Sequence, residues 1–303
     1  MRNLKILAAD PISEEAANEI GEMGELELSP AISPEELLEK IADVEILIVR
    51  SRTKVTSELI SSAKNLKGII RAGVGLDNID REAAKEKGIK ILNTPEAPTQ
   101  SVAELTIGLM LNLSRNICSA NTSTKAGSWE KGELSGTELS GKTLGIIGFG
   151  RVGKMVSELA LAFGLEILAY DPYASKEEMQ NASVRSSELG ELLSESDIIS
   201  LHAPLTEETR NLIGENEFSQ MKNGVLLINA ARAELIDEEA FYSAIESGKI
   251  RRAALDVYWG KKPSEKLLAI GDNVLLTPHL GSSTIEARER IGKLLVERVK
   301  DLV

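Results

Sequence analysis

Short apolar segments alternate with amphipathic segments along the first third of the chain. Where apolar residues run together, the pattern predicts strands at 4–9, 46–50, 68–72 and 89–92. The helical patterns between these strands begin after the N-cap residues Ser13, Ser33, Thr56 and Asp80. Strands separated by helices are typical of a parallel sheet with helices on both faces. The first third is therefore predicted to form a doubly wound α/β domain.

The same alternation resumes at Lys142, after a stretch at 126–141 that is rich in Gly, Ser and Glu and is predicted to be irregular. Further strands are predicted at 143–147, 166–170, 198–202, 225–229, 253–257 and 274–277. A final amphipathic helix is predicted at 283–299. The predicted fold class is α/β, with two doubly wound parallel-sheet domains in one chain.

A long helical pattern that begins near Ser101 joins the two halves. Its apolar residues, which lie on most sides of the helix, are Val102, Leu105, Ile107, Leu109, Met110, Leu111 and Leu113. A helix that is apolar all round has to be buried. We expect it to pack against a second copy of the chain in a homodimer, and burial within one chain fits the same pattern.

The composition is that of a globular protein. Of 303 residues, 42% are hydrophobic and 27% are charged, and the formal net charge is −12. This charge disfavours nucleic acid and anionic membranes as partners, so an anionic substrate has to be held by local arginines. The single cysteine, Cys118, excludes an intrachain disulfide, and neither a signal peptide nor an apolar run of about 18 residues is present. A cytoplasmic location is expected.

Three glycines, Gly148, Gly150 and Gly153, form G-x-G-x-x-G where an apolar strand meets an amphipathic helix. Such a turn brings the backbone N–H groups of a helix N-terminus to a pyrophosphate. Glycines at this spacing also occur in plain turns, but here the next strand ends in Asp171, about 20 residues further on, where an acid binds both ribose hydroxyls. Because this carboxylate repels a 2′-phosphate, NAD is predicted rather than NADP.

Several motifs in consistent order resemble the D-isomer-specific 2-hydroxyacid dehydrogenases over essentially the full length. They are R-A-G-V-G-L-D-N-I-D at 71–80, S-V-A-E-L at 101–105, E-L-S-G-K-T-L-G-I-I-G-F-G-R-V-G at 138–153, L-H-A-P-L-T at 201–206, N-A-A-R at 229–232, A-L-D-V at 254–257 and T-P-H-L-G-S-S-T at 277–284. Within the family, the chain is most similar to a short form of D-3-phosphoglycerate dehydrogenase without a regulatory domain. The resemblance implies a Rossmann NAD-binding domain at 94–283, inserted into a flavodoxin-like substrate domain formed by 1–93 and 284–303.

The resemblance also implies hydride transfer between C2 of a 2-hydroxy acid and C4 of the nicotinamide. Arg232 matches the arginine that holds and polarises the substrate, and His279 matches the general acid/base. A surface arginine and a packed histidine are the competing interpretations. His202, the other of the two histidines, is expected to contact the cofactor without moving protons, and Asp256 is expected to bind the nicotinamide carboxamide.

The full set of cofactor-contacting residues implied by the resemblance is Val102, Gly148, Gly150, Arg151, Val152, Gly153, Asp171, His202, Pro204, Ala230, Ala231, Arg232, Asp256, His279, Gly281 and Ser282. The implied substrate-binding residues are Arg50, Ser51, Arg52, Val74, Gly75 and Arg232. Among these, Val74 and Gly75 are expected to receive the substrate carboxylate with their backbone N–H groups. No metal site is predicted.

One family residue is missing. The family places a glutamate that pairs with the histidine in a D-V-F-x-x-E-P pattern, whereas this chain has D-V-Y-W-G-K-K-P at 256–263, with Lys261 at the glutamate position. A positive charge disfavours imidazolium, so His279 is predicted to be less basic than in its relatives. We expect a slow or acid-shifted enzyme, or none at all, unless Glu265 replaces the missing carboxylate.

The substrate is predicted from Arg50 and Arg52, which follow a strand and resemble the phosphate-contacting arginines of phosphoglycerate dehydrogenases. If the strand continues to Arg52, alternation places both side chains on one side. Solvated surface charge fits them about equally well. The leading hypothesis is oxidation of 3-phosphoglycerate, which feeds serine synthesis. The alternatives are a glyoxylate or hydroxypyruvate reductase, and a catalytically weak NAD-binding regulatory protein.

Overall fold

The computed structural model describes residues 4–129 and 131–303, and the chain divides into two compact units. The first unit comprises Met1–Pro98 and Ser283–Val303, and the second comprises Thr99–Ser282. The second unit is thus an insertion between two segments of the first. Its boundaries lie a few residues from those that the sequence suggested.

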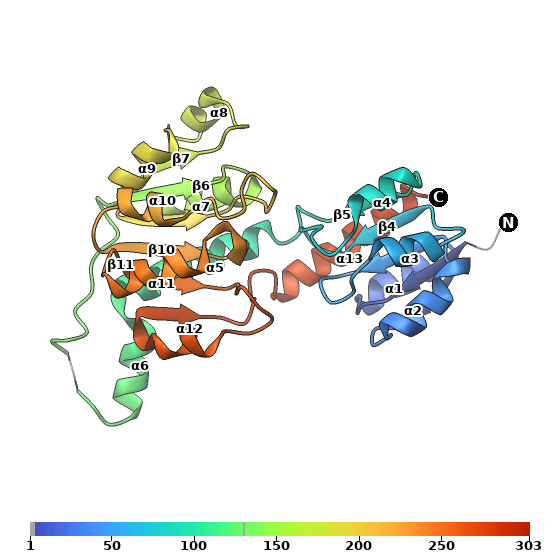
Figure 1. The fold of residues 1–303 in the computed structure, drawn as a ribbon, viewed down its shortest axis with the longest axis horizontal. Coiled ribbons are helices and arrows are strands. Elements are labelled where there is room, and N and C mark those ends of the chain that lie inside the picture. The colour runs from blue at the N-terminus through green and yellow to red at the C-terminus, as the bar shows by residue number, and fades with distance from the viewer. Residues whose placement is uncertain (1–3, 130) are drawn as a thin grey trace. The chain divides into compact units, whose positions relative to one another are not determined.

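A parallel sheet forms the centre of the first unit (Figure 1), with the strand order β2-β1-β3-β4-β5 in its described residues. Its strands are β1 (Lys5–Ala8), β2 (Glu25–Leu28), β3 (Ile46–Val49), β4 (Gly68–Arg71) and β5 (Lys90–Asn93). This order is that of the flavodoxin-like fold. The sequence analysis missed β2, an edge strand of sequence E-L-E-L that is exposed along most of its length and therefore has no apolar run.

Helices cover both faces of this sheet. They are α1 (Glu14–Gly21), α2 (Pro34–Lys40), α3 (Ser57–Ser62), α4 (Arg81–Glu86) and α13 (Ile285–Lys300), with a 3-10 turn at Ile41–Asp43. One core joins the sheet to α2, α3 and α4, and the other joins it to α1 and α13. The predicted N-caps are confirmed, because each of the side chains of Ser13, Ser33, Thr56 and Asp80 accepts a backbone N–H from the first turn of its helix.

The second unit contains a larger parallel sheet, whose order in the described residues is β12-β11-β10-β9-β6-β7-β8. From the β8 edge, this is the 3-2-1-4-5-6 order of dinucleotide-binding sheets with one further strand. Its strands are β6 (Thr143–Ile147), β7 (Glu166–Tyr170), β8 (Arg185–Ser186), β9 (Ile198–Leu201), β10 (Val225–Asn229), β11 (Ile250–Leu255) and β12 (Val274–Leu276). All but the two-residue β8 were predicted.

The helices of the second unit also lie on both faces of its sheet. They are α5 (Thr99–Arg115), α6 (Ile117–Lys125), α7 (Arg151–Leu161), α8 (Lys176–Asn181), α9 (Leu189–Glu195), α10 (Glu215–Gln220), α11 (Glu238–Glu246) and α12 (Glu265–Ala269), with 3-10 turns at Ala233–Leu235 and Gly271–Asn273. Side chains of α5, α7 and α8 share one core with the sheet, and those of α9, α10, α11 and α12 share the other. The fold class predicted from the sequence is confirmed.

The apolar helix near Ser101 is α5, and it is buried within its own unit. It packs along α7 and against β10 and β11, with Ala103, Ile107, Leu109, Met110 and Leu113 in the core. Packing within one chain therefore accounts for these residues, and the homodimer stays a prediction. Among the described residues, no helix has both the length and the apolar character that crossing a bilayer requires.

Candidate active site

The glycine turn lies at the switch point of the second sheet, between β6 and β9. Gly148 has a φ of +97°, and a Cβ there would lie 2.5 Å from the backbone nitrogen of Ala203. A Cβ on Gly153 would lie 2.1 Å from the carbonyl oxygen of Gly148. A Cβ on Gly150, in contrast, meets nothing within 4 Å, and the first turn of α7 has no side-chain cap. Open space beside an uncapped helix N-terminus fits the pyrophosphate of a dinucleotide.

Asp171 follows β7 and is joined to the glycine turn. Its Oδ2 accepts the N–H of Phe149 at 2.8 Å, and its Oδ1 accepts the N–H of Tyr173 at 2.8 Å. An ionised carboxylate has about four lone-pair directions. Two of them therefore remain for the ribose hydroxyls of an adenosine, and the position fits the role predicted for this residue.

His202 follows β9 beside the same turn. Its Nε2 lies 2.9 Å from the Oγ of the buried Ser200, and burial lowers its pKa to about 4. The imidazole is therefore neutral near pH 7, which agrees with a histidine that contacts a cofactor and moves no proton. Pro204, two residues later, is exposed, and its carbonyl oxygen accepts the hydroxyl of Thr209 at 2.6 Å.

The turn after β10 carries Arg232. The side chain of Asn229, which is fully buried, accepts the N–H of Ala231 at 3.0 Å and donates to the carbonyl oxygen of Arg232 at 2.8 Å. The Arg232 Nη1 donates to the Ala231 carbonyl at 2.7 Å, and Ala230 is half-buried. The sequence analysis gave Asn229 no role. The signal for it is an asparagine at a strand end, where its side chain can bond the following backbone.

The carboxylate of Asp256 follows β11 and is fully buried. Its Oδ1 accepts the hydroxyl of Thr277 at 2.6 Å and the N–H of Leu280 at 2.7 Å. Its Oδ2 accepts the N–H of Gly281 at 2.8 Å. Asp256 therefore holds both ends of the loop that carries His279, a contact that the sequence analysis did not foresee when it assigned this residue to the nicotinamide carboxamide.

His279 itself is exposed and has a φ of +56°. Left-handed backbone is uncommon for residues other than glycine, and the surrounding structure has to hold it in place. The bonds from Asp256 and the bond from the His279 N–H to the Thr277 carbonyl, at 2.9 Å, do this. The result is an exposed histidine whose backbone is held in one conformation.

Neighbouring strands bring these residues to one edge of the sheet. Because β10, β11 and β12 are adjacent and parallel, Arg232, Asp256 and His279 all follow carboxyl ends of neighbouring strands. A Cβ on the buried Gly281 would lie 3.3 Å from a methyl group of Val102, so α5 also reaches this edge. Ser282, the next residue, is half-buried. Ligands of open α/β sheets bind at such edges.

Lys261 lies in the segment between β11 and α12 and is exposed. Two aromatic side chains fix the preceding part of this segment. Tyr258 donates from its hydroxyl to the carbonyl of Thr277 at 2.6 Å, and the indole N–H of Trp259 donates to the carbonyl of Ile236 at 2.9 Å. Glu265, the first residue of α12, is exposed. Its use as a replacement carboxylate stays a prediction.

In the first unit, the loop that follows β4 carries Val74 and Gly75, whose role in binding a carboxylate stays a prediction. The amide of Asn93 donates to the carbonyl of Val74 at 2.7 Å and so fixes the loop. Within residues 4–129 and 131–303, the backbone N–H groups of Val74 and Gly75 donate to no protein acceptor. Two adjacent unused N–H groups beside a strand end can bind an anion.

The two arginines after β3 differ in their surroundings. The strand ends at Val49, so the condition under which both would alternate onto one side is not met. The Nε of Arg52 pairs with the Asp10 carboxylate at 2.8 Å, and its other nitrogens donate to the carbonyls of Ala9 and Ile32. Ser51 is exposed. The surroundings of Arg52 are those of a residue that joins neighbouring loops.

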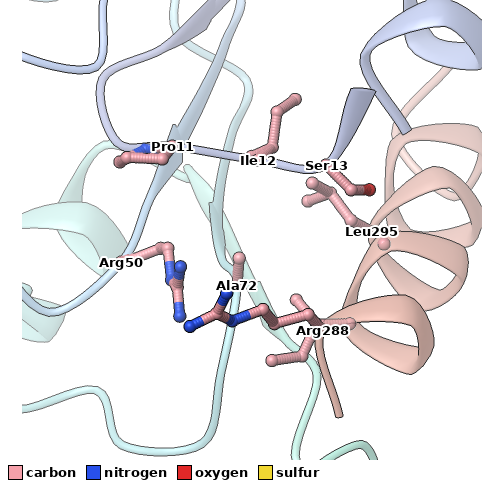
Figure 2. Close-up of a pocket in the computed structure, with 9 residues that line it drawn as sticks. Pro11, Ile12, Ser13, Arg50, Ala72, Arg288 and Leu295 are labelled. Atoms are coloured by element: carbon pink, nitrogen blue, oxygen red, sulfur yellow. The ribbon is translucent and has the colours of Figure 1, made fainter. Parts of the chain in front are cut away.

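Arg50 instead faces a cavity of about 260 Å³ in the first unit (Figure 2). The cavity is lined by Pro11, Ile12, Ser13, Arg50, Ala72, Arg288, Ile291, Gly292 and Leu295. The sequence analysis missed Arg288, which lies in the first turns of α13. Its signal is spacing: the exposed Arg288 precedes the buried Ile291 and Leu295 by three and seven residues, which places it on the same side of the helix, one and two turns earlier.

The family model for the D-isomer specific 2-hydroxyacid dehydrogenase NAD binding domain matches residues 107–281, more than half of the chain. The chain belongs to this family. Its second unit is accordingly a NAD-binding domain, as the glycine turn and Asp171 indicate.

Two related proteins are similar to this chain over almost all of its length. The D-3-phosphoglycerate dehydrogenase of Methanocaldococcus jannaschii is 48% identical over 99% of the chain, which spans 57% of that enzyme's length. The hydroxypyruvate reductase of Thermotoga maritima is 49% identical over 99% of the chain, which spans 98% of that protein. Among solved structures, a glyoxylate reductase from Paecilomyes thermophila has a TM-score of 0.92 at 32% identity, covering 99% of this chain and 95% of its own.

Proposed function

We propose that this 2-hydroxyacid dehydrogenase homologue catalyses NAD-dependent hydride transfer at C2 of a D-2-hydroxy acid. The observation that carries the proposal is the placement of Arg232, Asp256 and His279 after adjacent parallel strands of the unit that has the dinucleotide turn. NAD, when bound, supplies nicotinamide C4 as the hydride acceptor. The protein has to hold the acid, polarise its C2 oxygen and move one proton.

Each of these tasks suits a residue of the proposed site. The guanidinium of Arg232 offers a planar donor fork that fits the carboxylate and C2 oxygen of the acid. The exposed imidazole of His279 takes the hydroxyl proton during oxidation and returns it during reduction. Asp256 keeps the His279 loop in position through three hydrogen bonds. The N–H groups of Val74 and Gly75 are suited to the substrate carboxylate.

The proposed substrate is 3-phosphoglycerate, which would be oxidised to 3-phosphohydroxypyruvate in serine synthesis. Its support is the name of the archaeal relative and the Arg50 guanidinium at a cavity. A hydroxypyruvate or glyoxylate reductase is the second candidate, because the bacterial relative is as similar and is spanned along 98% of its length.

The direct test follows NADH absorbance with purified protein. Rates are measured with 3-phosphoglycerate and D-glycerate in the oxidative direction and with hydroxypyruvate and glyoxylate in the reductive direction. Arg232→Gln and His279→Gln should each lower kcat about 100-fold or more, while NADH binding, followed by its fluorescence, persists. Full activity in both variants, or no NADH binding by the wild-type protein, contradicts the proposal.

Lys261 supports a different class of function, a catalytically weak NAD-binding regulatory protein. Its exposed ammonium replaces the carboxylate that the family pattern pairs with the histidine. NADH binding at ordinary affinity without turnover of any 2-oxo acid in a broad panel would favour this function over a dehydrogenase.

The proposed assembly is a homodimer, and a cytoplasmic location stays a prediction. Among the described residues, α6 buries none of its side chains and extends away from the sheet (Figure 1), and Trp129, four residues after its end, is 85% exposed. Exposed aromatic side chains on a projecting segment are typical of association surfaces. Sedimentation velocity of the wild type and of Trp129→Ser tests the proposal, since a monomeric wild-type protein contradicts it.

A further inference from the structure

Two arginines of the first unit, Arg50 and Arg288, line the same cavity, and the nearby Asp10 carboxylate accepts the backbone N–H of Arg50 and pairs with Arg52 rather than with either guanidinium. Figure 2 shows the guanidinium groups of Arg50 and Arg288 directed toward one another. Within residues 4–129 and 131–303, neither guanidinium makes a hydrogen bond or an ion pair, whereas Arg52 pairs with Asp10 and Arg185 pairs with Glu191. Like charges that face each other repel. In a chain of net charge −12, such a pair indicates a place for an anion.

The cavity lies where ligands of α/β sheets bind. Arg50 directly follows β3, Ala72 follows β4 and Pro11 follows β1 by three residues, so the cavity is at the carboxyl edge of the sheet. The opposite wall is formed by α13, whose exposed Arg288 precedes the buried Ile291 and Leu295. A volume of about 260 Å³ suits one small anionic group, and not a dinucleotide.

The walls favour strong charge-assisted hydrogen bonds. Ile12, Ala72, Ile291 and Leu295 are apolar, and no residue that lines the cavity is acidic. These apolar side chains lower the local dielectric constant and strengthen the attraction between an oxyanion and the half-buried Arg50, whereas solvent screens the charge of the exposed Arg288. The cavity therefore repels a cationic ligand, whereas an anionic ligand would meet two guanidinium groups there.

The remaining polar side chain of the lining is that of Ser13. Ser13 caps α1, and its Oγ accepts the N–H of Ala16 at 3.3 Å. This hydroxyl lies against α13, where a Cβ on Gly292 would be 2.6 Å from it, and Figure 2 shows it directed away from the two guanidinium groups, so the charged donors of the cavity are the two arginines. Two guanidinium forks offer more donors than the two oxygens of one carboxylate can use, and they match the three terminal oxygens and the double charge of a phosphate group.

We infer that Arg50 and Arg288 form a binding site for a doubly charged phosphate-type oxyanion. The occupant is either the phosphate of a phosphorylated substrate or free inorganic phosphate. The first occupant rests on the proposed function, and the binding of an oxyanion does not. Arg288 is then the residue that separates phosphorylated from unphosphorylated 2-hydroxy acids, and Arg52 contributes to the fold of the neighbouring loops.

Binding is tested with inorganic phosphate as the probe. The protein is saturated with NAD, so that phosphate cannot occupy the dinucleotide turn, and phosphate is titrated by calorimetry at constant ionic strength. Arg288→Gln should raise the dissociation constant about tenfold to a hundredfold, as expected for one lost charge-assisted bond. Lys293→Gln is the matched control, since Lys293 is an exposed residue of the same helix outside the cavity and the net charge changes equally.

Kinetics then identify the occupant. If it is the substrate phosphate, Arg288→Gln should lower the ratio of kcat/KM for 3-phosphoglycerate to kcat/KM for D-glycerate about tenfold, and phosphate should compete with 3-phosphoglycerate in the wild type. If phosphate binds without competing and the ratio is unchanged, the site stands as one for free phosphate.

The result that contradicts the phosphate site differs from the result that contradicts the proposed dehydrogenase activity. Equal phosphate affinity in the wild type, Arg288→Gln and Lys293→Gln, or no phosphate binding to the wild type at tens of millimolar, rejects the site even when dehydrogenase activity is present. Phosphate binding that depends on Arg288 in a protein without dehydrogenase activity keeps the site and rejects the proposed function.

Discussion

The hydroxyl of Tyr258 donates a hydrogen bond to the carbonyl oxygen of Thr277 at 2.6 Å, and the same oxygen accepts the N–H of His279 at 2.9 Å. The Thr277 side chain is held in turn by Asp256. The end of β12 is thus fixed from two sides before the chain turns into the left-handed residue His279. The family pattern has phenylalanine where this chain has Tyr258, so this tether is additional to it.

Removing the tether should slow the reaction and leave cofactor binding intact. Burial and the nearby Asp256 charge raise the pKa of Tyr258, so its hydroxyl stays a donor at neutral pH. Tyr258→Phe should lower kcat about twofold to tenfold, the worth of one neutral hydrogen bond. The KM for NADH should stay within about twofold. Tyr173→Phe, at a 92% exposed residue, is the control. Equal kcat in both variants would show that the tether does not position His279.

Asp256→Asn should be more damaging. An asparagine has one acceptor oxygen, so its NH₂ group would face a backbone N–H of Leu280 or Gly281. The free energy of unfolding should fall by about 2 kcal/mol for the lost charge-assisted bond, and kcat should fall about tenfold or more. Urea unfolding and steady-state kinetics measure the two effects. The exposed Asp272→Asn is the control, and unchanged kcat in Asp256→Asn would contradict a positioning role.

Most of the fold was predictable because each buried parallel strand has a continuous run of apolar residues in its sequence. β3, with its buried I-L-I-V, and β10, with V-L-L-I-N, are examples, and the N-caps were found from single side chains. The sequence analysis missed β2 and β8, since an edge strand with alternating charges and a two-residue strand leave no such run. Edge pairing depends on neighbours that a local pattern does not contain.

The site was predictable only where a motif marks it. Arg232 and His279 lie after strands in recognisable motifs. Arg52 could not be separated from Arg50, because the difference lies in Asp10, which is distant in sequence. Arg288 was missed for the same reason: its cavity is built by three strand ends and the last helix, and no local segment contains it.

The neutrality of His202 has a consequence for stability at low pH. Its pKa is about 4 in the folded chain and about 6.5 when unfolded, so the unfolded state binds more protons between these values. The contribution of the neutral His202 to the free energy of unfolding is fully present well above pH 6.5. It is lost as the pH falls, by about 2 kcal/mol at pH 5 and about 3 kcal/mol below pH 4. NMR titration of the two histidine rings, assigned with His279→Gln, checks the pKa. A His202 midpoint near 6.5 would contradict it.

Lys261→Glu should raise kcat several-fold and shift its pH profile upward. A carboxylate near the imidazole favours the imidazolium form and raises its pKa, which restores the pairing of the family pattern. The matched control is Lys262→Glu, which changes the net charge equally at the adjacent exposed position. If both variants respond alike, the effect is one of overall charge. If neither responds and NADH binding is intact, the missing glutamate does not limit this protein.

Asp171 should decide between NAD and NADP by charge. The carboxylate accepts the N–H of Phe149 in the glycine turn, so its removal by Asp171→Ser should weaken the binding of both cofactors. Only NADP, however, gains from losing the repulsion between the carboxylate and its 2′-phosphate. The ratio of kcat/KM for NADP to that for NAD should therefore rise about tenfold or more in Asp171→Ser, and also in Asp171→Asn, which keeps one acceptor oxygen. If both cofactors weaken equally and the ratio stays constant, Asp171 shapes the turn without selecting the cofactor.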